Sequence, residues 1–479
     1  MRVCRLIIGF AWLLCPVLAS AQEAKPAAKA SDVVTYKDHV LPVLRKHCAN
    51  CHNADKATSD LNVMTYQTVM TGGASGEAIS PGKPDQSLLY RLVSHLDEPA
   101  MPPKQPKIPE TEIALLKRWI ELGAPDTQAG AAKVASRKVD LDLSSVSMGK
   151  PEGPPPMPKS LPAVELPAVL RAPPVTAMAA SPWAPVAAVA GHERISLFNT
   201  DTLEKIGDLP FPERIPYVLK FSRNGKLLLA AGGRGAALGK VVLFDVETGN
   251  RVGEIGDESD VVLAADISAD HKRVALGGPS KLVKIFDTET GELRQKMKKH
   301  TDWVTSLEFS PDGELLATGD RNGGVFVWEA ATGGIVFTLG DHKEAVTDMS
   351  WRADSQMLAT ASEDGRVILW FAEDGFPTRS INAHAASGST SRTPSPRNKL
   401  PGVLGVKYAH SGVFATVGRD NSARVWRSDG NQLVKMEGFA DMPSKIVLTH
   451  DGQRVITGDY AGQIKVWEVK DGKPVGELK

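Results

Sequence analysis

The stretch Phe309-Ser310-Pro311-Asp312-Gly313-Glu314-Leu315-Leu316-Ala317-Thr318-Gly319, with Val327-Trp328 after it, is one unit of a repeat in this 479-residue chain. It joins a strand end to a tight turn, an apolar strand and an aromatic residue that closes the next strand. The aromatic residue recurs at Phe198, Phe244, Phe286, Trp328, Trp370, Trp426 and Trp467. The intervals are 46, 42, 42, 42, 56 and 41 residues. An interval of about forty residues is typical of the four-stranded blades of a β-propeller.

Turn residues keep the same phase as the aromatic residues. The one long interval contains an insertion, residues 385–399, and removing it restores the period. A turn pair follows six of the seven aromatic residues: Thr248-Gly249, Thr290-Gly291, Thr332-Gly333, Asp374-Gly375, Asp429-Gly430 and Asp471-Gly472. These turns predict an all-β propeller of seven blades over residues 165–479. Residues 168–171 and 475–478 are each candidates for the outermost strand of one blade.

The repeats resemble the WD repeat family. Asp364 and Asp420, each six residues before a tryptophan, match the family's structural aspartate, and the histidines that match its position between blades are His300, His342 and His384. The first three repeats carry Phe in place of Trp, and no repeat has the literal Trp-Asp pair. Because the histidines recur in fixed phase, we interpret them as hydrogen-bonding residues between blades, not as a metal or catalytic cluster. The resemblance implies a platform that binds protein.

A C-x-x-C-H motif, Cys48-Ala49-Asn50-Cys51-His52, precedes the repeats. In an exported protein, two thiols at this spacing can form thioether bonds to one haem c, with His52 as the proximal iron ligand. The alternatives are a zinc half-site and a redox dithiol. A zinc site would need further paired ligands, but the only other cysteines are Cys4 and Cys15. A dithiol would need a βαβ context, whereas the residues before Cys48 have helical spacing.

Residues 33–126 predict a small all-α domain around this motif. Glu110 to Leu122 has the apolar stripe of a helix, and Gly123 ends it. Before this helix lies Pro99-Ala100-Met101-Pro102-Pro103-Lys104, where prolines hold the chain extended and present the thioether of Met101 to the far face of the haem. Rival distal ligands are Met64, Met70 and His95, and more remote ones are Met148 and Met157.

These segments resemble the cytochrome c domain found in secreted planctomycete proteins. The matching pieces are Cys48-Ala49-Asn50-Cys51-His52, Met101-Pro102-Pro103 and Trp119-Ile120-Glu121-Leu122-Gly123-Ala124. The resemblance implies that Cys48 and Cys51 attach the haem, that His52 is the proximal ligand and that Met101 is the distal ligand. It covers about a fifth of the chain.

The N-terminal segment, the linker and the net charge indicate where the protein is located and what it does not bind. Residues 1–21 combine Arg2 and Arg5 with an apolar run and a final Ala19-Ser20-Ala21, which predicts a signal peptide and a periplasmic or secreted protein. No later run is long and apolar enough to span a membrane. Residues 127–164 are rich in proline and predict a semi-rigid linker. The chain has 56 basic and 56 acidic residues, so its charge indicates no binding to nucleic acid.

Three functions agree with these features. The leading hypothesis is single-electron transfer through one haem, with the propeller docking a redox partner protein, because iron held by His and Met has no free position for a substrate. The second is an oxidoreductase with an active site in the propeller, although no Gly-x-Ser-x-Gly elbow or His-Glu-x-x-His helix occurs. Residues 232–240 resemble a phosphate loop only superficially and predict a long hairpin. The third is a redox-sensing scaffold in a secreted assembly.

Overall fold

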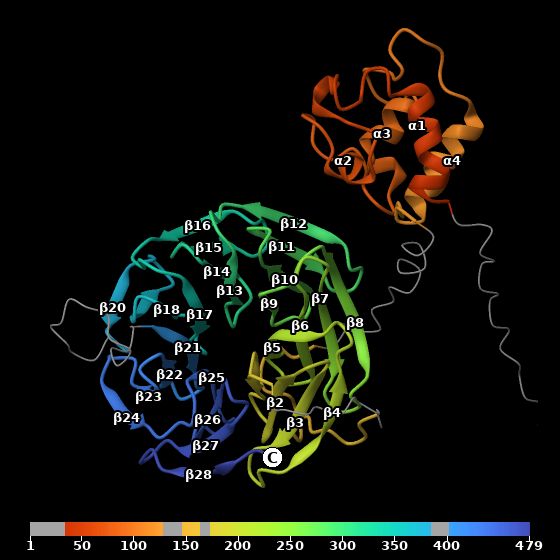
Figure 1. The fold of residues 1–479 in the computed structure, drawn as a ribbon. Helices are drawn as coiled ribbons and strands as arrows, with labels where there is room; N and C mark the ends of the chain where they lie inside the picture. The colour runs from red at the N-terminus through yellow and green to blue at the C-terminus, as the bar shows by residue number, and fades with distance from the viewer. Residues whose placement is uncertain (1–33, 128–145, 163–172, 385–401) are drawn as a thin grey trace, which may run out of the picture. The chain divides into compact units, whose positions relative to one another are not determined.

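The computed structural model describes residues 34–127, 146–162, 173–384 and 402–479. The chain divides into two compact units, residues 1–136 and 137–479 (Figure 1). The predicted signal peptide, the insertion at residues 385–399 and the candidate strand at residues 168–171 lie outside the described residues.

The first unit is small and mostly helical. Its helices are η1 (Tyr36–Val40), α1 (Leu41–His47), η2 (Thr58–Asp60), α2 (Tyr66–Thr71), η3 (Pro84–Gln86), α3 (Leu88–Val93) and α4 (Glu110–Glu121). Its apolar core includes Leu44 from α1 and Leu116 and Trp119 from α4, all fully buried. The Trp119 indole donates to the carbonyl of Pro125 (3.0 Å), which also accepts from the Tyr36 amide (2.8 Å). The two ends of the unit are therefore joined across its core.

The second unit is a propeller of seven four-stranded antiparallel blades, as the repeats predict (Figure 1). Blade 1 contains β1 (Met178–Ala180), β2 (Val186–Gly191), β3 (Arg194–Asn199) and β4 (Lys205–Pro210), and blade 2 contains β5 (Ile215–Phe221), β6 (Leu227–Arg234), β7 (Leu238–Asp245) and β8 (Arg251–Glu258). Blade 3 contains β9 (Ala264–Ile267), β10 (Arg273–Gly277), β11 (Leu282–Asp287) and β12 (Leu293–Lys298), and blade 4 contains β13 (Val304–Phe309), β14 (Leu315–Asp320), β15 (Val325–Glu329) and β16 (Ile335–Leu339). Blade 5 contains β17 (Val346–Trp351), β18 (Met357–Ser362), β19 (Val367–Phe371) and β20 (Pro377–Ile381), and blade 6 contains β21 (Val403–Tyr408), β22 (Phe414–Gly418), β23 (Ser422–Trp426) and β24 (Gln432–Met436). Blade 7 contains β25 (Pro443–Leu448), β26 (Arg454–Asp459), β27 (Ile464–Glu468) and β28 (Pro474–Glu477).

Each of the seven repeated aromatic residues lies in the third strand of its blade and is buried. There it packs with apolar residues of its own blade and of a neighbouring one. Trp328, for example, shares a cluster with Val283 and Ile285 of blade 3. A large buried ring at this position stabilises the contact between blades, which explains why the aromatic residue recurs in phase.

The ring closes between blade 7 and blade 1 without exchanging a strand. All four strands of each described blade come from consecutive segments, and the outermost strand of blade 7 is β28, at the position that residues 475–478 predict. Closure uses the Val175 amide, which donates to the Asp459 carbonyl (3.1 Å), and the Ser444 hydroxyl, which donates to the Val175 carbonyl (2.9 Å). A shared apolar cluster contains Phe198 of blade 1 and Val466 of blade 7.

Residues 146–162 pack against the propeller. Pro156 is buried, and Leu161 contacts the apolar cluster of blades 1 and 2. The amide of Lys159 donates to the Glu247 carbonyl (2.8 Å), and its ammonium pairs with the Glu247 carboxylate (2.9 Å). This part of the proline-rich segment therefore belongs structurally to the propeller. A spacer role for residues 127–164 as a whole stays a prediction.

The repeat histidines form hydrogen-bonded networks with a threonine, a tryptophan and an aspartate. In blade 6, the two ring nitrogens of His384 lie 2.7 Å from the Asp420 carboxylate and 2.8 Å from the Thr416 hydroxyl. Trp426 donates to the same hydroxyl (2.9 Å). The same arrangement occurs at His300 and His342. It connects the segment between two blades to the core of the following blade.

We expect Asp420→Asn to destabilise the propeller at neutral pH by about 2 kcal/mol. Burial acts to raise the pKa of Asp420, but hydrogen bonds and the charges of His384 and Arg424 hold it down at about 2. An aspartate with a depressed pKa stabilises the fold above its unfolded pKa of about 3.9, and this contribution is lost as the pH falls through its folded pKa. Urea unfolding of wild type and variant should therefore differ at pH 7 and converge toward pH 2. The exposed Asp441, changed to Asn, is the control that should show no such difference.

Candidate functional site

The C-x-x-C-H motif begins where α1 ends. The amide of Cys48 donates to the Leu44 carbonyl (2.8 Å) and completes the last turn of the helix. The carbonyl of Cys48 then accepts from the amides of Cys51 (3.2 Å) and His52 (3.0 Å). The second of these is the bond of one α-helical turn. The two cysteines and the histidine are thus held on one compact turn at the end of α1.

The loop after the motif fixes the orientation of that turn. The carbonyl of Cys51 accepts from the Thr58 amide (3.0 Å), and the carbonyl of His52 accepts from the Val63 amide (2.9 Å). The Asn53 side chain donates to the carbonyl of Ala49 (2.8 Å). The backbone carbonyls of Cys48, Ala49, Cys51 and His52 therefore all accept hydrogen bonds within the domain, which fixes the turn from which the motif side chains project.

These side chains fit a haem attachment site. Cys48 and Cys51 are free thiols and are partly buried. The Nδ1 atom of His52 is buried and has no hydrogen-bond partner among the described residues. A buried polar atom without a partner costs free energy unless a ligand or water satisfies it. Two free thiols beside an imidazole with an unsatisfied nitrogen are suited to a group that takes all three, as haem c does.

Burial affects the protonation of one thiol. It raises the pKa of Cys48 to about 11. At neutral pH this thiol is therefore protonated, whereas thiols of dithiol oxidoreductases have lowered pKa values.

Met101 lies in the segment between α3 and α4. Its amide donates to the Leu92 carbonyl (3.1 Å), and its carbonyl lies 3.2 Å from Nε2 of His95. The Met101 side chain is partly buried and packs against the same apolar core as Cys48. Met70 in α2 packs against that core as well. The structure thus associates Met101 and Met70 with the core that borders the motif, and Met101 as distal ligand stays a prediction.

The other candidate ligands are placed differently. His95 is exposed. Met64 is partly buried but is not among the residues packed against this core. Met148 is exposed and borders a groove on blades 3 and 4, and Met157 belongs to the segment packed on the propeller.

Glu112 is a supporting residue that sequence reasoning missed. It lies in α4, and its two carboxylate oxygens bind Lys46 (2.9 Å) and His47 (2.6 Å) at the end of α1. The hydrogen bond from Lys46 is the largest cause that lowers the pKa of Glu112. The contacts attach the residues just before the motif to α4. Since 65 residues separate His47 from Glu112, no local pattern indicates the pair.

The propeller has little of the chemistry that a metal or phosphate site needs. Among the described residues, no group of three or more His, Cys, Asp or Glu side chains is arranged to hold a metal ion. Residues 232–240 form the predicted hairpin, with Arg234 of β6 opposite Leu238 of β7. No helix in the described part of the chain is long and apolar enough to cross a membrane.

Comparisons with known proteins agree with both units. Residues 48–105 match the family described as planctomycete cytochrome C. Residues 291–329 and 333–370 match the WD domain, G-beta repeat family. The chain is therefore a seven-bladed WD-type propeller combined with a cytochrome c-like domain, and such a domain implies binding of haem c.

Curated relatives match a short part of the chain. The angio-associated migratory cell protein of Homo sapiens is 41% identical over 58 residues, which is 12% of this chain. The proteins of the same name from Pongo abelii and Canis lupus familiaris match equally. The matched region spans only 13% of the length of each relative. The similarity is to part of these proteins, and their functions do not transfer to this chain.

Proposed function

We propose that this protein is an exported mono-haem c-type cytochrome that transfers single electrons and docks a redox partner through its propeller. Cys48 and Cys51 would attach the haem, His52 would be the proximal ligand and Met101 the distal ligand. When bound, the haem supplies a one-electron redox centre. The observation that carries the proposal is the turn at residues 48–52, which presents two free thiols and an imidazole with an unsatisfied nitrogen inside a cytochrome c-like domain.

The surroundings of the motif support electron transfer. Cys48 and Met101 both pack against an apolar core that includes Val40, Leu44 and Trp119. An apolar shell limits the access of water and tunes the reduction potential of a metal centre. If His52 and Met101 both held the iron, they would leave it no position for a substrate, which suits a one-electron carrier. The residues of this domain therefore act by attaching, orienting and shielding the redox group.

Export and partner binding rest on other features. The apolar run and small-residue end of residues 1–21 have the pattern of a signal peptide. Export agrees with the motif, because two free thiols that take haem are characteristic of exported c-type cytochromes. A propeller of WD-type repeats is typically a platform for protein–protein contacts, which supports a redox partner protein as its ligand.

Met101→Ala tests the ligand set. The protein should be produced in a host that attaches haem c, and absorption spectra recorded in both redox states. We expect low-spin, six-coordinate haem in the wild type and a change to high-spin haem in Met101→Ala, because the side chain that fills the distal position is lost. Met70→Ala is the matched control, since this methionine packs on the same core, and it should stay low-spin.

The other outcomes are equally informative. Loss of the low-spin state in Met70→Ala alone would make Met70 the ligand. High-spin haem in the wild type would mean an open iron position and would favour the oxidoreductase hypothesis. Protein containing zinc and no haem would refute the proposed function.

A further inference from the structure

The centre of the propeller contains a cavity with an asymmetric lining. The first strands of the seven blades surround the ring axis, and a cavity of about 170 Å³ lies at the end where these strands finish. One position can be compared between blades: the second-to-last residue of the first strand that pairs with the second strand. Glu308 faces Ala317, Ser350 faces Ala359 and Val447 faces Ile456, each one residue before the end of its strand pair.

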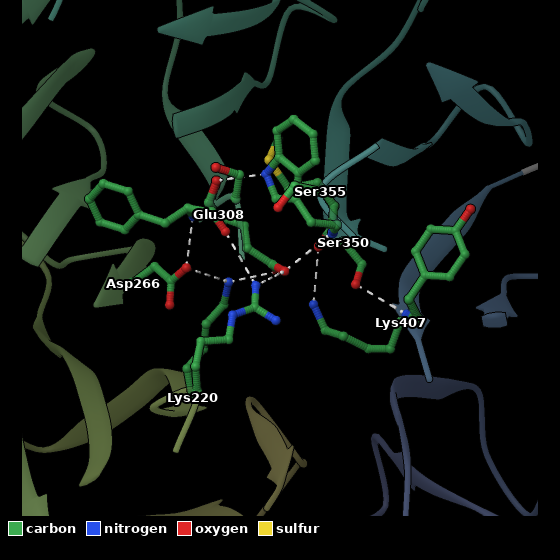
Figure 2. A network of polar contacts seen from close by, with 12 residues as sticks. Lys220, Asp266, Glu308, Ser350, Ser355 and Lys407 are labelled. Atoms are coloured by element: carbon green, nitrogen blue, oxygen red, sulfur yellow. Dashed lines mark hydrogen bonds and ion pairs between the residues drawn. The ribbon is translucent and has the colours of Figure 1, made fainter. Parts of the chain in front are cut away.

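On one side of the ring, the side chain at this position accepts a hydrogen bond from the next blade (Figure 2). Asp266 of blade 3 accepts from the Phe309 amide (2.8 Å). Glu308 of blade 4 accepts from the Trp351 amide (3.2 Å). Ser350 of blade 5 accepts from the Tyr408 amide (3.1 Å). Blades 3 to 6 are therefore joined, one to the next, by a side-chain oxygen and a backbone amide beside the axis.

On the other side, the same position offers no acceptor. The equivalent residues are Lys407 in blade 6, Val447 in blade 7 and Ala179 in blade 1. The backbone amides that would donate to such an acceptor are those of Leu448, Ala180 and Phe221, and all three residues line the cavity. Among the described residues, no side chain accepts from these amides. The cavity wall thus presents backbone donors without a side-chain acceptor.

A side chain of the cavity wall also lacks a hydrogen-bond partner. His450 lines the cavity, and its buried Nδ1 has no partner among the described residues. The charged residues of the wall comprise three cations, Lys220, Arg223 and Lys407, and two carboxylates, Asp266 and Glu308. Both carboxylates already accept from neighbouring groups: Lys220 donates to Glu308 (2.8 Å) and lies 3.6 Å from Asp266. Arg223 also pairs with Glu308 (3.3 Å), and Lys407 pairs with the neighbouring Asp348 carboxylate (2.9 Å), so each cation of the wall has a carboxylate partner. The backbone amides and the imidazole of His450 are therefore the donors that favour a ligand with acceptor oxygens.

We propose that this axial cavity binds a small oxyanion, whose oxygens join blades 6, 7, 1 and 2 as Asp266, Glu308 and Ser350 join blades 3 to 6. Carboxylates and phosphates share this chemistry. The site is separate from the haem-binding motif, so the inference does not depend on the proposed electron transfer.

Val447→Asp is the decisive variant. It places a carboxylate in blade 7 at the position that Glu308 occupies in blade 4, where it can accept from the amide of Ala180 and repels an anion from the cavity. Val475→Asp is the matched control, because it makes the same substitution on the exposed outer strand β28 of the same blade. His450→Phe removes one donor without adding charge and provides a second variant if Val447→Asp fails to fold.

Binding should be measured by calorimetry on the full chain with citrate and with inorganic phosphate, each against chloride at equal ionic strength. We expect saturable binding of one of the two anions to wild type and to Val475→Asp, and at least tenfold weaker binding to Val447→Asp and His450→Phe. Citrate binding alone would identify a carboxylate site, and phosphate binding alone a phosphate site. Absence of saturable binding to wild type, or equal binding by wild type, Val447→Asp and His450→Phe, would overturn the proposal.

Discussion

Protein in which both Cys48 and Cys51 are replaced by alanine is expected to contain no covalently bound haem after production with a c-type maturation system. Each thiol of the motif forms one of the two thioether bonds of haem c, and no other cysteine occurs after residue 51. The expected change is complete, because no remaining side chain can form the bond. Haem staining of the denatured chain and its intact mass measure the attachment directly.

Two controls separate attachment from folding. The single variants Cys48→Ala and Cys51→Ala should each keep at most one thioether bond, and the wild type made without the maturation system should carry none. Far-ultraviolet circular dichroism should retain the strand signal of the propeller in every sample, because the motif lies in the other compact unit. Haem that stays attached to the denatured double variant would contradict the assignment of Cys48 and Cys51.

Glu308→Ala is expected to destabilise the propeller by about 3–5 kcal/mol, because it removes one member of a buried charge network. The Glu308 side chain is only 9% exposed and binds Lys220 (2.8 Å) and Arg223 (3.3 Å) (Figure 2). Burial alone would raise the pKa of Glu308, but the cations around it, led by Lys220, hold it at about 2. Without Glu308, Lys220 keeps one nearby carboxylate, Asp266, at 3.6 Å, and the Trp351 amide loses its acceptor. Buried charges and donors without partners are strongly unfavourable.

Urea unfolding followed by tryptophan fluorescence measures this effect, since Trp328, Trp351 and Trp370 are buried in blades 4 and 5. The matched control is Glu314→Ala, which removes an exposed carboxylate from the same blade and should change the free energy of unfolding by less than about 0.5 kcal/mol. Equal stability of Glu308→Ala and Glu314→Ala would show that the network contributes no net stability.

The repeats were sufficient to predict the propeller. The seven aromatic residues occupy equivalent third strands because each blade buries the same ring in the same place. The prediction of seven blades is confirmed, and so is the matching of the repeats to the WD family. The structural aspartate of blade 4 was missed. It is Asp320, which lies eight residues before Trp328 instead of six, so spacing alone did not indicate it.

The motif residues could also be predicted from the sequence, since the spacing of Cys48, Cys51 and His52 is local and specific. The contacts that hold the motif in place could not be predicted. Glu112 reaches the residues before the motif from α4, and only the packing of α4 against the start of the domain brings them together. Which of Met101 and Met70 is the distal ligand also depends on tertiary packing, because both side chains pack against the same apolar core. The roles of these residues in haem binding stay predictions for the spectra to decide.

The sequence by itself determined the two units, the number of blades and the turn that carries the two thiols and the imidazole. These features depend on periodicity, turn residues and short spacings, all of which lie within a single repeat or motif of the sequence. Only the tertiary structure decided which charges meet at the axis and which donors stay without acceptors. Lys220 and Glu308 are 88 residues apart, and they meet because ring closure places the first strands of all blades around one axis. The free energy of a buried charge such as Glu308 depends on neighbours from other blades. A local stretch of sequence does not contain these neighbours.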